Sequence, residues 1–134
     1  MSMPAAKQGD TITAVDIHIV MVPAPPSPPV PTPLPHPFKG IIDGGLSQDV
    51  KIMGLPAATV GSTATNTPAH LPTPPGTAFQ MPPTNRAKIS MGSTTVLING
   101  KSAARNGDTA ITCNDPVDIP SGTVVATGRV LIGG

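Results

Sequence analysis

The sequence predicts an all-β fold built from short strands and tight turns. Two observations favour it: β-branched residues recur at alternate positions, and glycine and proline interrupt the chain throughout. The 134 residues include 14 glycines and 19 prolines but no glutamate. Long helices are therefore disfavoured, because proline breaks helices and good exposed helix formers are scarce. The length suits one domain over residues 1–134.

The strand signals are short alternations separated by glycines, which suit hairpin turns. The longest is residues 11–22, rich in Ile, Val and Thr, where Val15, Ile17 and Ile19 share one face. The others, in chain order, are Val50 with Ile52, Ile89 with Met91, Val96 with Ile98, and the closing run 123–132 with Val124, Val125, Val130 and Ile132.

Two proline-rich segments lie between these strands. Residues 23–37 hold nine prolines in fifteen positions, which predicts an extended polyproline II loop without ladder hydrogen bonds. Residues 71–83 hold five prolines and predict a second loop. Both loops should lie inside the single domain, because the strands beside them are too short to fold alone.

Composition argues against several classes of protein. No basic patch with interleaved aromatic residues is present, so nucleic-acid binding has little support. No apolar run approaches the roughly 18 residues of a membrane span. Residues 1–7 lack the apolar core of a signal peptide, so synthesis in the cytoplasm is expected. Cys113 is the only cysteine and cannot form an intramolecular disulfide.

An internal repeat is the most informative feature of the sequence. Residues 50–64 align without gaps to residues 96–110, with the common pattern V-x-I-x-G-x-[PS]-A-A-x-x-G-[DS]-T-A. A third copy is split between the ends of the chain: residues 130–134 match its first half and residues 4–11 its second. Joining the C-terminus to the N-terminus would give three strand-turn-strand units in a ring.

The repeat register suggests a metal site formed by His18, His36, His70 and Cys113. No two of them have a short zinc-finger spacing, so the local signal is weak. Three of them, however, follow the repeat at similar offsets: His18 and His70 come 14 residues after the Pro of their Ala-Ala core, and Cys113 comes 11 residues after the corresponding Ser. In a threefold arrangement such positions converge on the axis.

His36, held between two prolines, would supply the fourth ligand of that site. Three imidazoles and one thiolate suit tetrahedral Zn²⁺, and four protein ligands leave no position for water, so the site would be structural. A chain with two phenylalanines and no tryptophan has little apolar bulk, and small cores often need such a metal. The alternative is three unrelated histidines and a buried thiol.

The remaining polar residues give little support to catalysis. The seven aspartates mostly adjoin Gly, Pro or Asn, where Asp commonly caps turns. A turn-capping role is therefore preferred over paired-carboxylate catalysis or a calcium site. Ser47, Ser90 and Ser93 have no nucleophile-elbow context. Lys7 and Arg105 occupy equivalent repeat positions, where each is a solvated charge or pairs with a neighbouring Asp. The aspartates are Asp10, Asp16, Asp43, Asp49, Asp108, Asp115 and Asp118.

The three repeat cores resemble the Pro-Ala-Ala-Arg, or PAAR, repeat family. They read Pro4-Ala5-Ala6-Lys7, Pro56-Ala57-Ala58-Thr59 and Ser102-Ala103-Ala104-Arg105, each followed by Gly and Asp or Ser, although none spells the full motif. The resemblance implies a small cone of β-hairpins that caps the trimeric β-helical spike of a contractile injection machine. That machine would be a type VI secretion system or an extracellular phage-tail-like particle. It also implies a zinc ion near the tip, bound by three His and one Cys.

A tip protein of this kind would be non-enzymatic. Its hairpin edges would pair with the spike, one chain per trimer rather than as a homo-oligomer, and its apex would meet a target membrane transiently. It would be exported with the particle, and any effector cargo would be a separate molecule. Since 11% of the residues are charged, salt should weaken binding only modestly. The partner-binding residues expected are Val50, Ile52, Val96, Ile98, Val130 and Ile132.

The sequence leaves two other functions open. The first is a zinc hydrolase with a three-His site, which needs Cys113 away from the metal and a general base nearby. The second is a mainly disordered proline-rich adaptor, recognised by aromatic grooves. Coordination by Cys113 would argue against the first, and a cooperative unfolding transition would argue against the second.

Overall fold

The computed structural model describes residues 2–134, which form β-strands and no helix, as the sequence predicts. A membrane-spanning helix is accordingly absent from these residues. The strands are β1 (Met3–Pro4), β2 (Thr11–Ala24), β3 (Ser27–Gly44), β4 (Lys51–Ile52), β5 (Leu55–Pro56), β6 (Thr63–Asn66), β7 (Ala78–Phe79), β8 (Arg86–Ile89), β9 (Leu97–Ile98), β10 (Lys101–Ser102), β11 (Thr109–Thr112), β12 (Ile119–Val125) and β13 (Leu131–Ile132).

Six of the strands form a sheet that closes on itself. Its order is β12-β11-β8-β6-β3-β2, and β12 also pairs with β2, while β7 adds to the far part of β2. The closed sheet therefore consists of three antiparallel pairs, β2 with β3, β6 with β8, and β11 with β12. Its interior is filled by fully buried apolar side chains, among them Ile12, Phe38, Ile42, Ile89 and Val124.

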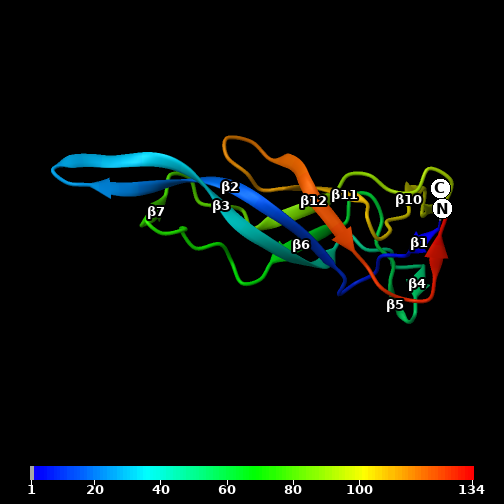
Figure 1. Cartoon of the computed structure of the whole chain (residues 1–134). Helices are drawn as coiled ribbons and strands as arrows, with labels where there is room; N and C mark the ends of the chain where they lie inside the picture. Colours follow the sequence, from blue (N-terminus) through cyan, green and yellow to red (C-terminus); the bar gives the residue numbers. More distant parts are fainter. Residues whose placement is uncertain (1) are drawn as a thin grey trace.

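The molecule is elongated because one hairpin is far longer than the others (Figure 1). Strands β2 and β3 contain 14 and 18 residues, and they extend from the closed sheet to one end of the molecule. Both chain termini lie at the opposite end. We call residues 15–37 of this hairpin the arm, and the end that holds the termini the base.

The three Ala-Ala cores of the repeat contact one another in a closed cycle. The amide of Ala58 donates to the carbonyl of Ala6 (3.0 Å), that of Ala104 to Ala58 (3.1 Å), and that of Ala6 to Ala104 (2.9 Å). All three side chains are fully buried. Only a residue as small as alanine leaves room for three backbones to approach so closely, which explains the small-residue stretch in each repeat.

The same turn follows each Ala-Ala core. A side-chain oxygen accepts a hydrogen bond from the backbone amide three residues earlier: Asp10 from Lys7 (3.0 Å), Ser62 from Thr59 (3.0 Å) and Asp108 from Arg105 (2.7 Å). Lys7 and Arg105 also form ion pairs with these aspartates, at 3.2 and 3.0 Å. The turn-capping role predicted for Asp10 and Asp108 is therefore confirmed.

The base consists of three two-stranded hairpins, β4–β5, β9–β10 and β13–β1. The first two close through Met53-Gly54 and Asn99-Gly100, whose positive φ angles (52° and 84°, 52° and 78°) give the left-handed turn that suits a tight hairpin. The third pair has the same form as these hairpins but no connecting turn, because its two strands are the ends of the chain, with Met3 opposite Ile132. The termini are thus neighbours at the base, as the split repeat predicts.

A circular permutant follows from this arrangement. Joining Gly134 to Met3, without residues 1–2, would leave two glycines between the paired strands, as in the other two hairpins. A chain opened between Ile52 and Met53 should therefore unfold cooperatively, with a melting temperature within a few degrees of the parent. Thermal denaturation followed by circular dichroism checks this, and the absence of a cooperative transition would show that the ring is not the folding unit.

The prediction of a polyproline II loop over residues 23–37 is wrong for most of that range. Residues 27–37 belong to β3 and pair with β2 in register, for example Pro35 with Ile17 and Pro33 with Ile19. Proline is accepted because from residue 29 to residue 37 it occupies every second position, and only alternate residues of an antiparallel pair need to donate to the partner strand.

Two smaller differences concern the other expected elements. The loop predicted over residues 71–83 is largely irregular but contains β7, which pairs with β2. The closing run 123–132 is not continuous: β12 ends at Val125, and β13 begins only at Leu131. The interruption allows the chain to leave the closed sheet and enter the base.

Candidate metal centre

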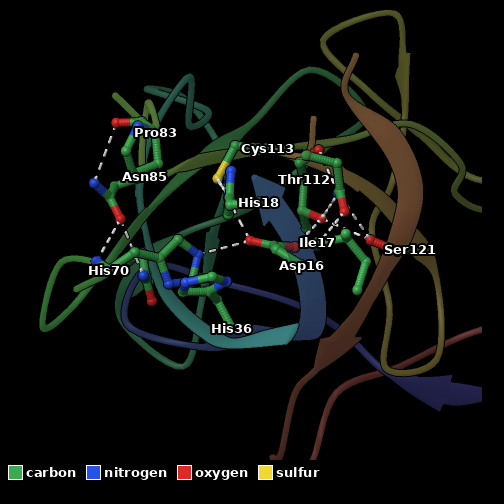
Figure 2. A network of polar contacts seen from close by, with 12 residues as sticks. Asp16, Ile17, His18, His36, His70, Pro83, Asn85, Thr112, Cys113 and Ser121 are labelled. Carbon is green, nitrogen blue, oxygen red and sulfur yellow. Dashed lines mark hydrogen bonds and ion pairs between the residues drawn. The ribbon is translucent and has the colours of Figure 1, made fainter. Parts of the chain in front are cut away.

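Four buried side chains gather where the arm leaves the closed sheet. The ligand atoms of Asp16, His18, His70 and Cys113 all lie within 4.8 Å of one another (Figure 2). Asp16 and His18 come from β2, Cys113 follows the end of β11, and His70 lies in the segment between β6 and β7. The structure thus brings together three of the four predicted ligands from three separate parts of the chain.

Local structure explains why these side chains point inward. Successive residues of a strand face opposite sides, so Asp16 and His18 share the buried face of β2 while Ile17 is exposed. The backbone amide of His70 donates to the side-chain oxygen of Asn85 (2.8 Å), which fixes the loop that carries it. The ring of Phe79 closes the cluster, with its centroid 5.9 Å from that of His18.

Asp16 accepts hydrogen bonds from three side chains of the centre. The Nε2–H of His70 donates to it at 2.9 Å, the hydroxyl of Thr112 at 2.6 Å and the thiol of Cys113 at 3.4 Å. The carboxyl group is completely buried, and its ion-pair partner is a histidine rather than a Lys or Arg. A buried carboxylate needs a compensating positive charge, which a divalent cation would supply.

His18 gives a second sign of a metal site. Its Nε2 lies 3.6 Å from the sulfur of Cys113, and its Nδ1 lies 3.5 Å from a carboxylate oxygen of Asp115. Among the described residues, this Nδ1 is the only buried side-chain nitrogen or oxygen that has no hydrogen-bond partner. An imidazole that points one nitrogen at a thiol and the other at a carboxylate has the arrangement typical of a metal-binding histidine.

His36 adjoins the cluster without joining the group of four. Its ring centroid lies 5.4 Å from that of His18 and 5.5 Å from that of His70. Its Nδ1–H donates to the carbonyl of Leu34 (2.8 Å), and its Nε2 accepts from the amide of Thr73 (3.1 Å). Its role as fourth ligand stays a prediction, because coordination through Nε2 requires release of the bond to Thr73.

The sequence predicts a turn-capping role for Asp16, and this prediction is wrong, since Asp16 lies in the middle of β2. A signal for its true position was present. Asp16 precedes His18 by two residues within a strongly alternating segment, so both had to lie on the same face of the strand. A charged residue on the buried face of a strand commonly marks a site.

Burial controls the protonation of Cys113. Desolvation, followed by the nearby charge of Asp16, raises the pKa of the thiol to about 11 from an ordinary 9.0. Without a metal the side chain is therefore a neutral thiol at physiological pH. A metal would have to displace this proton, because the thiolate is the form that coordinates. A pocket of about 380 Å³ lies beside the centre and is lined by His36 and His70.

The metal-free protein should lose stability as the pH falls. Burial, more than any other cause, lowers the pKa of His36 below its ordinary 6.5. The unfolded chain then takes up a proton near that pH while the folded chain does not, so acid favours unfolding. In chelator, the urea midpoint should fall between about pH 7 and about pH 5, and less so in His36→Gln. A midpoint that stays constant or rises would contradict this assignment.

The residues predicted to bind a partner lie at the base. Ile52, Ile98 and Ile132 are buried against one another in a small second core, with exposed fractions of 6–7%. Val96 packs against this core, whereas Val50 and Val130 are exposed. The same three hairpins present larger exposed apolar side chains that sequence reasoning missed, because they alternate with the buried isoleucines. These are Met53, Leu55, Leu97 and Leu131.

Comparison with known protein families adds the decisive observation. Residues 1–118 of the 134-residue chain match the PAAR motif. The chain belongs to the PAAR motif family. Membership implies a place at the spike tip of contractile injection systems. A search of curated proteins gave no significant match.

Proposed function

We propose that this PAAR protein is the non-enzymatic tip of the spike of a contractile injection machine. One observation carries the proposal: the molecule has a base of three similar hairpins at one end and a long tapering arm at the other (Figure 1). A single chain that offers three similar edges can cap a threefold-symmetric partner. The cycle of hydrogen bonds between the three Ala-Ala cores supports such a threefold relation.

The surface proposed to meet the spike includes large exposed apolar side chains. Leu97 and Leu131 occupy matching positions in two hairpins and are 64% and 58% exposed, while the third hairpin has Lys51 there. Large exposed apolar residues at one end of a small protein are typical of an interaction surface. A groove of about 310 Å³ lies between the hairpin β9–β10, which contributes Asn99, and the segment before β4, which contributes Ser47. We propose that the trimer's three strand ends seat against these hairpins.

The proposed ion is Zn²⁺, held by His18, His70 and Cys113. The fourth ligand would come from His36, as the family implies, or from Asp16, as the group of four suggests. Bound zinc would supply two positive charges and would join β2, the segment before β7 and the end of β11. The Cys113 sulfur lies inside the cluster, which favours a closed structural site over a hydrolytic one.

Co-purification with the cognate trimeric spike tests this function. The wild-type chain should stay bound through gel filtration and lose little binding at high salt, since charged side chains contribute little. Leu131→Asp should weaken binding by about tenfold or more, because it buries a charge in the interface. Val30→Asp, at the far end of the arm, is the matched control and should bind normally. Equal binding by wild type and Leu131→Asp would contradict this placement of the interface.

A further inference from the structure

Strand β3 has an open edge along the arm. Within residues 2–134, β3 pairs with β2 on one side, but on its other side it pairs with β6 only from Gly40 onward. The segment after β6 touches this edge at Thr73, whose hydroxyl donates to the carbonyl of Pro35 (2.8 Å). An unpaired edge offers its backbone to any strand that meets it, and a second copy of the chain always carries the same edge.

The residues of β3 that face this open edge follow from the hydrogen bonds of β2. The amide of Ile17 donates to the side chain of Asn114 (2.7 Å) and that of Ile19 to the side chain of Asp115 (2.9 Å), so both bond away from β3. In an antiparallel pair, the residues opposite such positions also bond away from their partner. Each outward position of the arm from residue 31 onward is a proline, which has no N–H. These positions are Pro31, Pro33, Pro35 and Pro37.

The run of prolines stops where another strand begins to cover the edge. The next two outward positions are Lys39 and Ile41. The amide of Lys39 donates to the side chain of Asn66 (2.9 Å), and Ile41 pairs with Thr65 of β6. Outward donors are therefore missing where the edge is open and return where β6 accepts them. The inward positions, which donate to β2, contain no proline; they are Val30, Thr32, Leu34, His36 and Phe38.

The other usual means of protecting an edge strand are not used along the arm. Charged side chains and β-bulges serve this purpose in many sheets. Residues 17–38 contain no Asp, Glu, Lys or Arg, and β2 and β3 stay in regular register from Thr11 to Val22. We propose that the alternate prolines prevent the arm of one copy from pairing edge to edge with the arm of another, and so keep the free chain monomeric. This inference goes beyond the proposed function, because it concerns the chain without a partner.

Restoring donors to the edge tests this inference. Pro31→Thr/Pro33→Thr supplies an N–H at both positions, and threonine suits a strand without adding a large apolar side chain. Two such arms related by a twofold axis can exchange backbone hydrogen bonds, with residue 31 of one copy opposite residue 33 of the other. The full-length, zinc-loaded variant should self-associate about tenfold or more strongly than wild type, which should stay a 13.5 kDa monomer. Sedimentation velocity over a concentration series measures both.

A control variant and a second readout locate the contact. Pro82→Thr/Pro83→Thr makes the same exchange in the irregular segment before β8 and should remain monomeric. Hydrogen exchange read by mass spectrometry should show the new amides at residues 31 and 33 exchanging rapidly in the dilute monomer and slowly in the associated form. Pro33→Thr alone repeats the test if the double variant does not fold. A folded edge variant that associates no more than wild type or the control, or that associates without protecting these amides, would overturn the proposal.

Discussion

Replacing Cys113 with Ser, or His70 with Ala, is expected to remove the bound metal and lower the melting temperature together. A structural zinc contributes an apparent ~10–16 kcal/mol in small domains, comparable with the whole stability of such a domain. Loss of only about 4 kcal/mol of this would lower the melting temperature by roughly 10 °C or more. Elemental analysis and thermal unfolding of the same samples measure both quantities. Leu71→Ala is the control, because its side chain is exposed and lies beside His70.

The identity of the fourth ligand can be decided by a matched pair of variants. If His36 coordinates, His36→Ala should lose most of its zinc affinity, and Asp16→Asn should lose about 10–100-fold, as removal of an outer partner does. If Asp16 coordinates, the order of the two effects reverses. Zinc competition titrations give both values. A wild-type protein that holds no metal, and whose melting temperature chelator does not change, would contradict the metal centre itself.

Enlarging one alanine of the central cycle is expected to have the second-largest effect. Ala58 is fully buried, and its amide and carbonyl both bond to the neighbouring cores. Ala58→Leu adds three carbons at a point where three backbones meet, so it should cost about 3 kcal/mol or more. Urea denaturation measures the loss. Ala78→Leu, at an exposed position of β7, is the control and should be close to neutral; equal effects of the two changes would contradict close packing at the cycle.

Regular features of the fold could be read from the sequence because each repeat encodes them locally. The Gly turns, the Asp and Ser caps and the Ala-Ala cores recur in fixed register, so their equivalence was visible without a structure. The closeness of the two chain ends at the base followed from the same register, and the structure shows it in the pairing of Met3 with Ile132. Strand β2 was also predictable, because its alternation is long and strict.

Features that depend on how one segment pairs or packs with another were not predictable. Residues 27–37 have the composition of a polyproline II loop, and only the partner strand β2 converts them into a β-strand. The exposed face of the base was missed for a similar reason, since the isoleucines of the repeat turn inward. At the metal centre, histidine and cysteine were recognisable by residue type, whereas Asp16 could be separated from the other aspartates only by its place in the alternating segment, two residues before His18.

The central claim is that one chain caps one trimeric spike, and the mass of the purified complex tests it most directly. The chain and its cognate spike should be co-expressed, purified at moderate salt and weighed by native mass spectrometry. The proposed cap predicts one chain of about 13.5 kDa for each spike trimer, because the three hairpins of a single base would occupy all three strand ends. Three chains per trimer, or no complex at moderate salt, would contradict it.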